Sequence, residues 1–63
     1  MYRIHFSNHG YFAEATYPTV EAAIAAGKSI CFEFTVHPIE DDGKPGYAIL
    51  AWSPITGLRR LVQ

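Results

Sequence analysis

Histidine and glutamate are the side chains of this 63-residue sequence whose chemistry would suit zinc binding or acid–base catalysis. His5, Glu14, Glu33 and His37 lie in segments where apolar and polar residues alternate, so all four are expected on one face of a sheet. Their spacing matches no zinc motif, and no nucleophile can be placed beside a base. The sequence therefore predicts no catalytic residue, no metal site, no cofactor and no enzymatic activity.

Arginine offers a second kind of chemistry, the binding of nucleic acid. The chain has five Lys and Arg against six Asp and Glu, so a net charge of −1 provides no overall basic field. Arg59 and Arg60 are adjacent, and Arg3 is expected to point outward from a strand. Together with outward aromatic rings, which stack on bases, these three arginines make a nucleic-acid-binding accessory protein the alternative function.

The composition and the single cysteine indicate the class of protein. At 49% hydrophobic, 14% aromatic and 17% charged residues, the chain is typical of a folded domain, and we expect one domain over residues 1–63. No apolar run reaches the ~18 residues of a membrane span, and the first residues do not resemble a signal peptide. Cys31 lies between Ile30 and Phe32, which favours a buried thiol in a reducing, cytoplasmic setting.

The spacing of apolar residues predicts four strands and one helix. The segments that alternate, or are nearly all apolar, are 2–7, 11–17, 32–37 and 47–52. Between the second and third, apolar residues recur with a helical period, which predicts a helix over about 20–30. Thr19 can cap its first turn. Gly27 would be explained by close approach of the helix to the sheet, or by the end of the helix.

These elements define an α+β fold with the order β-β-α-β-β. We expect a four-stranded antiparallel sheet in the strand order 2-1-3-4, with the helix on one face. The other face must then meet water or a partner.

The two turns set which residues point to which face, because a slip of one residue reverses every side chain of a strand. Asn8-His9-Gly10 marks the first turn, and the predicted register pairs Phe6 with Ala13 and Tyr2 with Tyr17. Asp42-Gly43 indicates a two-residue second turn beside a solvated acidic tip. That turn would pair Val36 with Ile49 and place Leu50 and Trp52 on the uncovered face.

The predicted function follows from the uncovered face. Leu50, Trp52 and Phe12 would form an apolar patch there, rimmed by Arg3, His5 and Thr35. The patch, or an edge strand, would dock a second copy of the chain or another protein, so we expect a small non-enzymatic interaction module with no membrane partner. Residues 53–63 have two interpretations: a surface turn followed by a short fifth strand, or a tail that folds back over Trp52.

Overall fold

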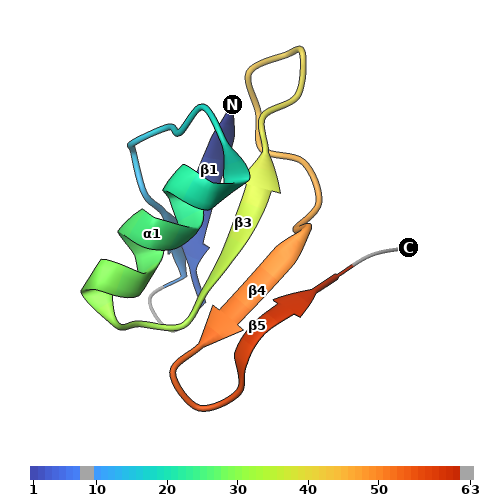
Figure 1. Ribbon diagram of the computed structural model, residues 1–63. Coiled ribbons are helices and arrows are strands. Elements are labelled where there is room, and N and C mark those ends of the chain that lie inside the picture. The colour runs from blue at the N-terminus through green and yellow to red at the C-terminus, as the bar shows by residue number, and fades with distance from the viewer. Residues whose placement is uncertain (8–9, 62–63) are drawn as a thin grey trace.

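A computed structural model describes residues 1–7 and 10–61 of the chain. The predicted α+β class and the single helix are confirmed, but the sheet has a fifth strand (Figure 1). All neighbouring strands are antiparallel, and the strand order is β2-β1-β3-β4-β5. The elements are β1 (Tyr2–Phe6), β2 (Tyr11–Phe12), α1 (Val20–Ile30), β3 (Phe34–Pro38), β4 (Leu50–Ser53) and β5 (Gly57–Arg60).

Helix α1 begins and ends as its sequence predicts. The Thr19 hydroxyl accepts a hydrogen bond from the backbone N–H of Ala22 at 3.1 Å, which satisfies one free donor of the first turn. At the other end Cys31 adopts a left-handed conformation with φ of 66° and closes the last turn. The prediction of a buried Cys31 is wrong: the residue is exposed, because the helical period does not continue beyond this cap.

Gly27 lets the helix approach the sheet closely. A Cβ atom at this position would lie 2.5 Å from the ring of Phe34, which is wholly buried. The first of the two predicted reasons for this glycine is therefore confirmed. The helix packs on β1 and β3, and the buried core beneath it consists of Ile4, Phe6, Ala23, Phe34, Val36 and Leu50.

The prediction for the β3–β4 turn is wrong by one residue. Glu40 and Lys44 face each other, with the Glu40 N–H donating to the Lys44 carbonyl at 2.8 Å, so the loop has three residues, 41–43. Gly43 takes a φ of 83°, which is the left-handed conformation that three-residue hairpin loops require at their last position. Asp42-Gly43 does mark the turn, but the loop includes one residue more than predicted.

This shift of one residue in register reverses the sheet face to which each β4 side chain points. Trp52 pairs with Phe34 and Leu50 pairs with Val36, so both lie on the helix side of the sheet and not on the uncovered face. Leu50 belongs to the buried core, and the indole of Trp52 stacks on the Phe34 ring with centroids 5.4 Å apart. The predicted apolar patch of Leu50, Trp52 and Phe12 therefore does not form.

In the first hairpin the side chains point to their predicted faces, but the register near the turn differs from the prediction. Tyr2 is bridged to Tyr17 as predicted, but Phe6 pairs with Tyr11 and not with Ala13. From the His5–Phe12 pair to the Tyr2–Tyr17 bridge, β1 advances three residues while the second strand segment advances five. Because the difference of two residues is even, each side chain still points to its predicted face of the sheet. Residues 8 and 9 of the predicted turn lie outside the described residues.

We expect Gly27→Ala to destabilise the protein, although alanine is the better helix former by about 1 kcal/mol. The added methyl group must displace the buried Phe34 ring, and overpacking of this kind costs about 1–3 kcal/mol. Urea unfolding measures the difference. The control is Ala25→Gly at an exposed site of α1, which should lose about 1 kcal/mol through helix propensity alone. An increase in stability for Gly27→Ala would show that the helix does not depend on this contact.

Candidate functional site

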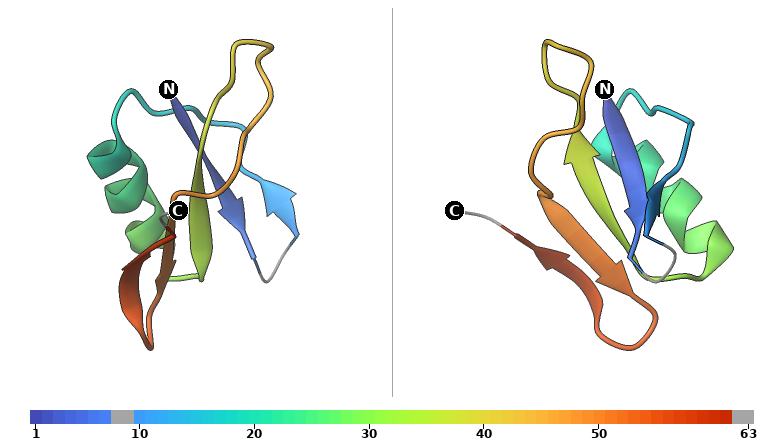
Figure 2. Two further views of the ribbon diagram at one scale, coloured as in Figure 1. Left: turned by 90° about the vertical axis from the view of Figure 1, so that its right-hand side faces the viewer. Right: turned by 180° about the vertical axis from the view of Figure 1, so that it is seen from behind.

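The helix covers only part of its side of the sheet. It packs on β1 and β3, while the β4–β5 hairpin extends beyond it and curls toward the helix side (Figure 2). Side chains on the helix side of the sheet become more exposed from β3 through β4 to β5, away from the helix. Phe34 has no exposed area, its neighbour Trp52 is half-buried, and Leu58 on β5 is 47% exposed.

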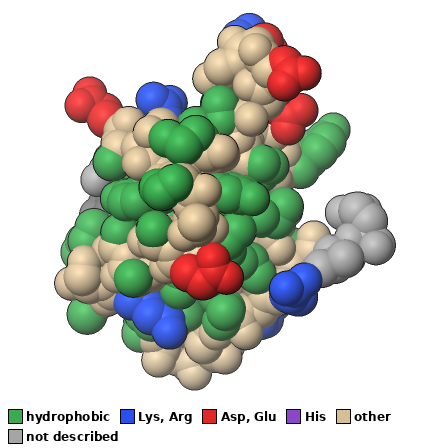
Figure 3. Space-filling view, turned by 45° about the horizontal axis from the view of Figure 1, so that its top comes forward, with side chains coloured by type: hydrophobic (Ala, Val, Ile, Leu, Met, Phe, Trp, Pro, Cys, Tyr) green, Lys and Arg blue, Asp and Glu red, His purple; other side chains and the backbone are tan. Residues whose placement is uncertain are grey.

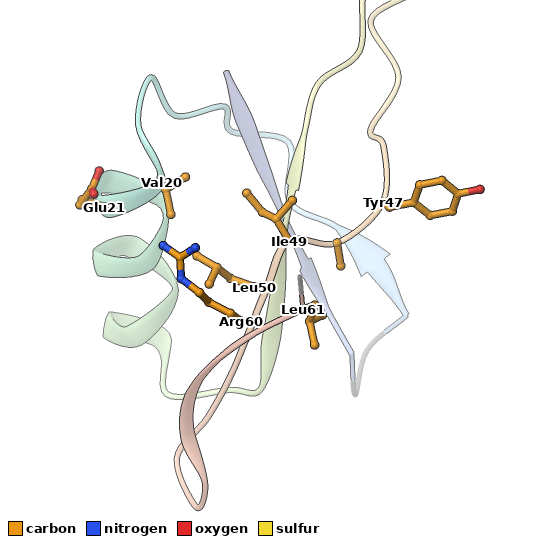
Figure 4. Close-up of a pocket in the computed structure, with 8 residues that line it drawn as sticks. Val20, Glu21, Tyr47, Ile49, Leu50, Arg60 and Leu61 are labelled. Atoms are coloured by element: carbon orange, nitrogen blue, oxygen red, sulfur yellow. The ribbon is translucent and has the colours of Figure 1, made fainter. Parts of the chain in front are cut away.

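A cleft of about 880 Å³ lies between the start of α1 and the β4–β5 hairpin (Figure 4). We call it the α1–β4 cleft. Its volume falls within the range of about 300–1,000 Å³ that ligand sites have. Hydrophobic side chains gather on the face seen in Figure 3, with charged side chains among and around them. The residues lining the cleft are Val20, Glu21, Tyr47, Ala48, Ile49, Leu50, Arg60 and Leu61.

The sequence builds this cleft through two extra residues before β4. From the Ile39–Pro45 bridge to the Val36–Leu50 pair, β3 advances three residues while the returning chain advances five. These two extra residues make the chain bulge outward at Tyr47, which is 93% exposed. The backbone N–H of Ile49 donates to the Val36 carbonyl at 2.9 Å, and the Ile49 carbonyl accepts from the Leu61 N–H at 2.9 Å. The cleft floor is therefore held by the sheet, while its rim is open.

The sheet face opposite α1, the outer face, carries a second group of side chains. Strand register aligns one row across all five strands: Phe12, His5, Thr35, Ala51 and Arg59. The neighbouring pair is Arg3 and His37. The structure thus places Arg3, His5, Thr35 and Phe12 on the face predicted for them, and their role in binding stays a prediction.

Three rings on the outer face contact one another. The Phe12 ring lies 4.7 Å from His5 and 5.0 Å from His37 between centroids, and the two imidazoles are 6.0 Å apart. His37 is held further by two hydrogen bonds of 2.8 Å, one between Nε2 and the Thr35 hydroxyl and one between Nδ1 and the Gly46 carbonyl. The strand register places Phe12, and not Glu14, opposite His5.

The two adjacent arginines of β5 belong to different faces. Arg59 pairs with Ala51 on the outer face, whereas Arg60 pairs with Leu50 and lines the cleft. Arg3 lies on the outer face with Arg59 but donates to the Glu14 carbonyl at 3.5 Å. The predicted set of three arginines is therefore divided, with two on one face and one on the other.

Within residues 1–7 and 10–61, no group of three or more His, Cys, Asp or Glu side chains could hold a metal ion. Nor does any helix of those residues have the length and apolar character needed to cross a membrane. Comparisons with protein-family models, with curated proteins and with solved structures found no match to this chain. The function of the candidate site must therefore be inferred from its geometry.

Most of the cleft was not predictable from sequence. Leu50 was expected at a binding site, but on the other face, and Arg60 was expected to bind nucleic acid. Val20, Tyr47 and Leu61 gave no signal of their own, because the cleft depends on how far one helix extends over the sheet. The one available sequence signal was the long apolar segment from Tyr47 to Trp52, which a single buried face cannot fully accommodate.

We expect neutral His37 to carry its proton on Nδ1, because the Gly46 carbonyl beside that nitrogen can only accept a hydrogen bond. The Thr35 hydroxyl would then donate to Nε2. Long-range ¹H–¹⁵N correlation spectra, recorded where the imidazole is neutral, identify the tautomer. Thr35→Val should leave the proton on Nδ1 and shift the Nε2 resonance. Detection of the Nε2–H tautomer in the unmodified protein would contradict the hydrogen-bond arrangement.

Proposed function

We propose that this chain is a small non-enzymatic interaction module that binds a segment of another protein at the α1–β4 cleft and along the edge of β5. The observation that carries the proposal is the position of an apolar cleft directly beside an unpaired sheet edge. A cleft of this kind can take side chains, while the edge can take the backbone of the same bound segment.

The backbone of β5 is arranged to accept another strand. The Leu61 N–H donates to the Ile49 carbonyl, so Leu61 belongs to a hydrogen-bonded pair of the β4–β5 ladder. Such pairs alternate with non-bonded pairs in antiparallel sheets, which leaves the N–H and C=O groups of Leu58 and Arg60 directed away from β4. These groups can bond to an added strand.

Burial supports the same proposal. Only six hydrophobic side chains of the described residues are buried, whereas Leu58 and Tyr47 are large and exposed at the edge and at the cleft. A domain of this size buries a small fraction of its surface compared with larger ones, so a partner that covers apolar side chains adds appreciable stability. The single cysteine of the sequence favours a cytoplasmic, reducing setting for the module.

Selection from a displayed library of random peptides tests this function without a known partner. We expect the protein to enrich peptides that bind at micromolar affinity and lose at least about tenfold in affinity toward Leu58→Lys, because a charge would replace an apolar contact at the edge. Fluorescence anisotropy of labelled peptides measures the affinities.

Ile55→Lys is the matched control, because Ile55 is 91% exposed and does not line the cleft. Its binding should equal that of the unmodified protein. Thermal unfolding of both variants confirms that each is folded. Failure to enrich any peptide, or enriched peptides that bind both variants equally well, would remove the proposed function.

Nucleic-acid binding by the outer face is the second candidate, favoured by one observation. Arg3 and Arg59 share that face with the three-ring contact of Phe12, His5 and His37. Cations neutralise phosphates and aromatic rings stack on unpaired bases, so the combination suits a single strand.

Anisotropy of a fluorescent oligothymidylate and an oligouridylate at low salt tests this candidate. Binding should weaken with added salt and weaken further in Arg59→Glu, because fewer counterions would be released. Lys28→Glu changes the same charge on the exposed end of α1 and should have a smaller effect. The absence of any anisotropy change at low salt would remove the candidate.

A further inference from the structure

We infer that the segment bound at β5 is an extended strand that alternates apolar residues, directed into the α1–β4 cleft, with acidic residues on the outer face. The inference rests on the proposed function and specifies its partner by chemistry. Alternation follows from strand geometry, since successive side chains of a strand point to opposite faces.

The faces of β5 determine what each side of the bound strand meets. Leu58 and Arg60 lie on the cleft side, across from Trp52 and Leu50, while Gly57 and Arg59 lie on the outer face. Residues directly opposite one another in a sheet share a face, so the side chain opposite Arg59 also points to the outer face. The side chain opposite Leu58 points to the cleft side.

The charged surroundings of β5 differ between its two sides. The cleft is lined by both Glu21 and Arg60, together with apolar residues, so it favours an uncharged, apolar side chain. On the outer face Arg59 has Ala51 as its cross-strand neighbour, and the part of the chain that the structure describes gives its guanidinium no hydrogen bond or ion pair. A carboxylate opposite Arg59 would supply that partner.

A second copy of this chain does not fit this description. Pairing β5 with its own copy would bring two pairs of arginines to one edge, and like charges at an edge oppose such pairing. The chain's acidic run, Glu40 to Asp42, lies in a tight turn closed by hydrogen bonds from Glu40 to Lys44 and from the Lys44 N–H to Asp42. It is therefore not available as an extended strand.

Three synthetic peptides of equal length test the inference: alternating valine and glutamate, alternating valine and lysine, and alternating valine and threonine. We expect the valine–glutamate peptide to bind about fivefold more tightly than the threonine peptide at low salt, and the lysine peptide to bind least. Arg59→Glu should reverse the order of the two charged peptides. Lys28→Glu, with the same charge change on α1, should not.

Amide exchange measured by NMR locates the bound peptide. The backbone N–H groups of Leu58 and Arg60 should gain protection when the peptide binds, while the N–H of Ile55 should not. Equal binding of all three peptides at β5 would overturn the acidic partner but leave the proposed function intact. Peptide binding without protection at Leu58 and Arg60 would overturn strand addition, and a protein mass that doubles with concentration would show a second copy as the occupant.

Discussion

The ring of Phe34 holds the sheet and the helix together. It lies beneath Gly27 of α1, stacks on Trp52 at 5.4 Å and meets Phe6 edge-on at 6.4 Å. Because Gly27 has no side chain, the helix axis can settle directly over this ring. A helix is about 10 Å wide and strands are about 4.8 Å apart, so one helix centred here covers about two strands. The five-stranded sheet is therefore left partly bare on the side that carries its core.

The cleft and the sheet edge both follow from that limited cover. β4 turns Leu50 and Trp52 toward the core, yet β5 lies beyond the reach of α1, and Leu58 remains 47% exposed. The residues before β4 widen the gap, since two extra residues project Tyr47 outward. The site is thus not added to the fold as a separate loop or motif. It is the part of the core layer that a single short helix cannot close.

The sequence predicted the helix and its capping threonine because these depend on residues close together in the chain. It predicted which side chains of the first hairpin point to each face because residues 2–7 and 11–17 both alternate apolar and polar residues. The facing of β4 depended on whether the second turn had two residues or three, and Asp42-Gly43 suits both. Tyr47 to Trp52 is apolar on both faces, so the strand itself contained no signal that could correct the turn. The cleft was beyond prediction because it depends on the lateral position of α1.

The division of Arg59 and Arg60 between two faces connects the two candidate functions. A strand alternates its side chains, so adjacent arginines cannot act together on one polyanion lying against either face. A bound acidic strand would engage Arg59, which is also one of the two outer-face arginines that a nucleic acid would need. The two ligands would therefore compete at Arg59, while the cleft would be occupied by the peptide alone. Substitution in the cleft separates the two functions, because the outer face presents Phe12, His5 and Arg3 independently of it.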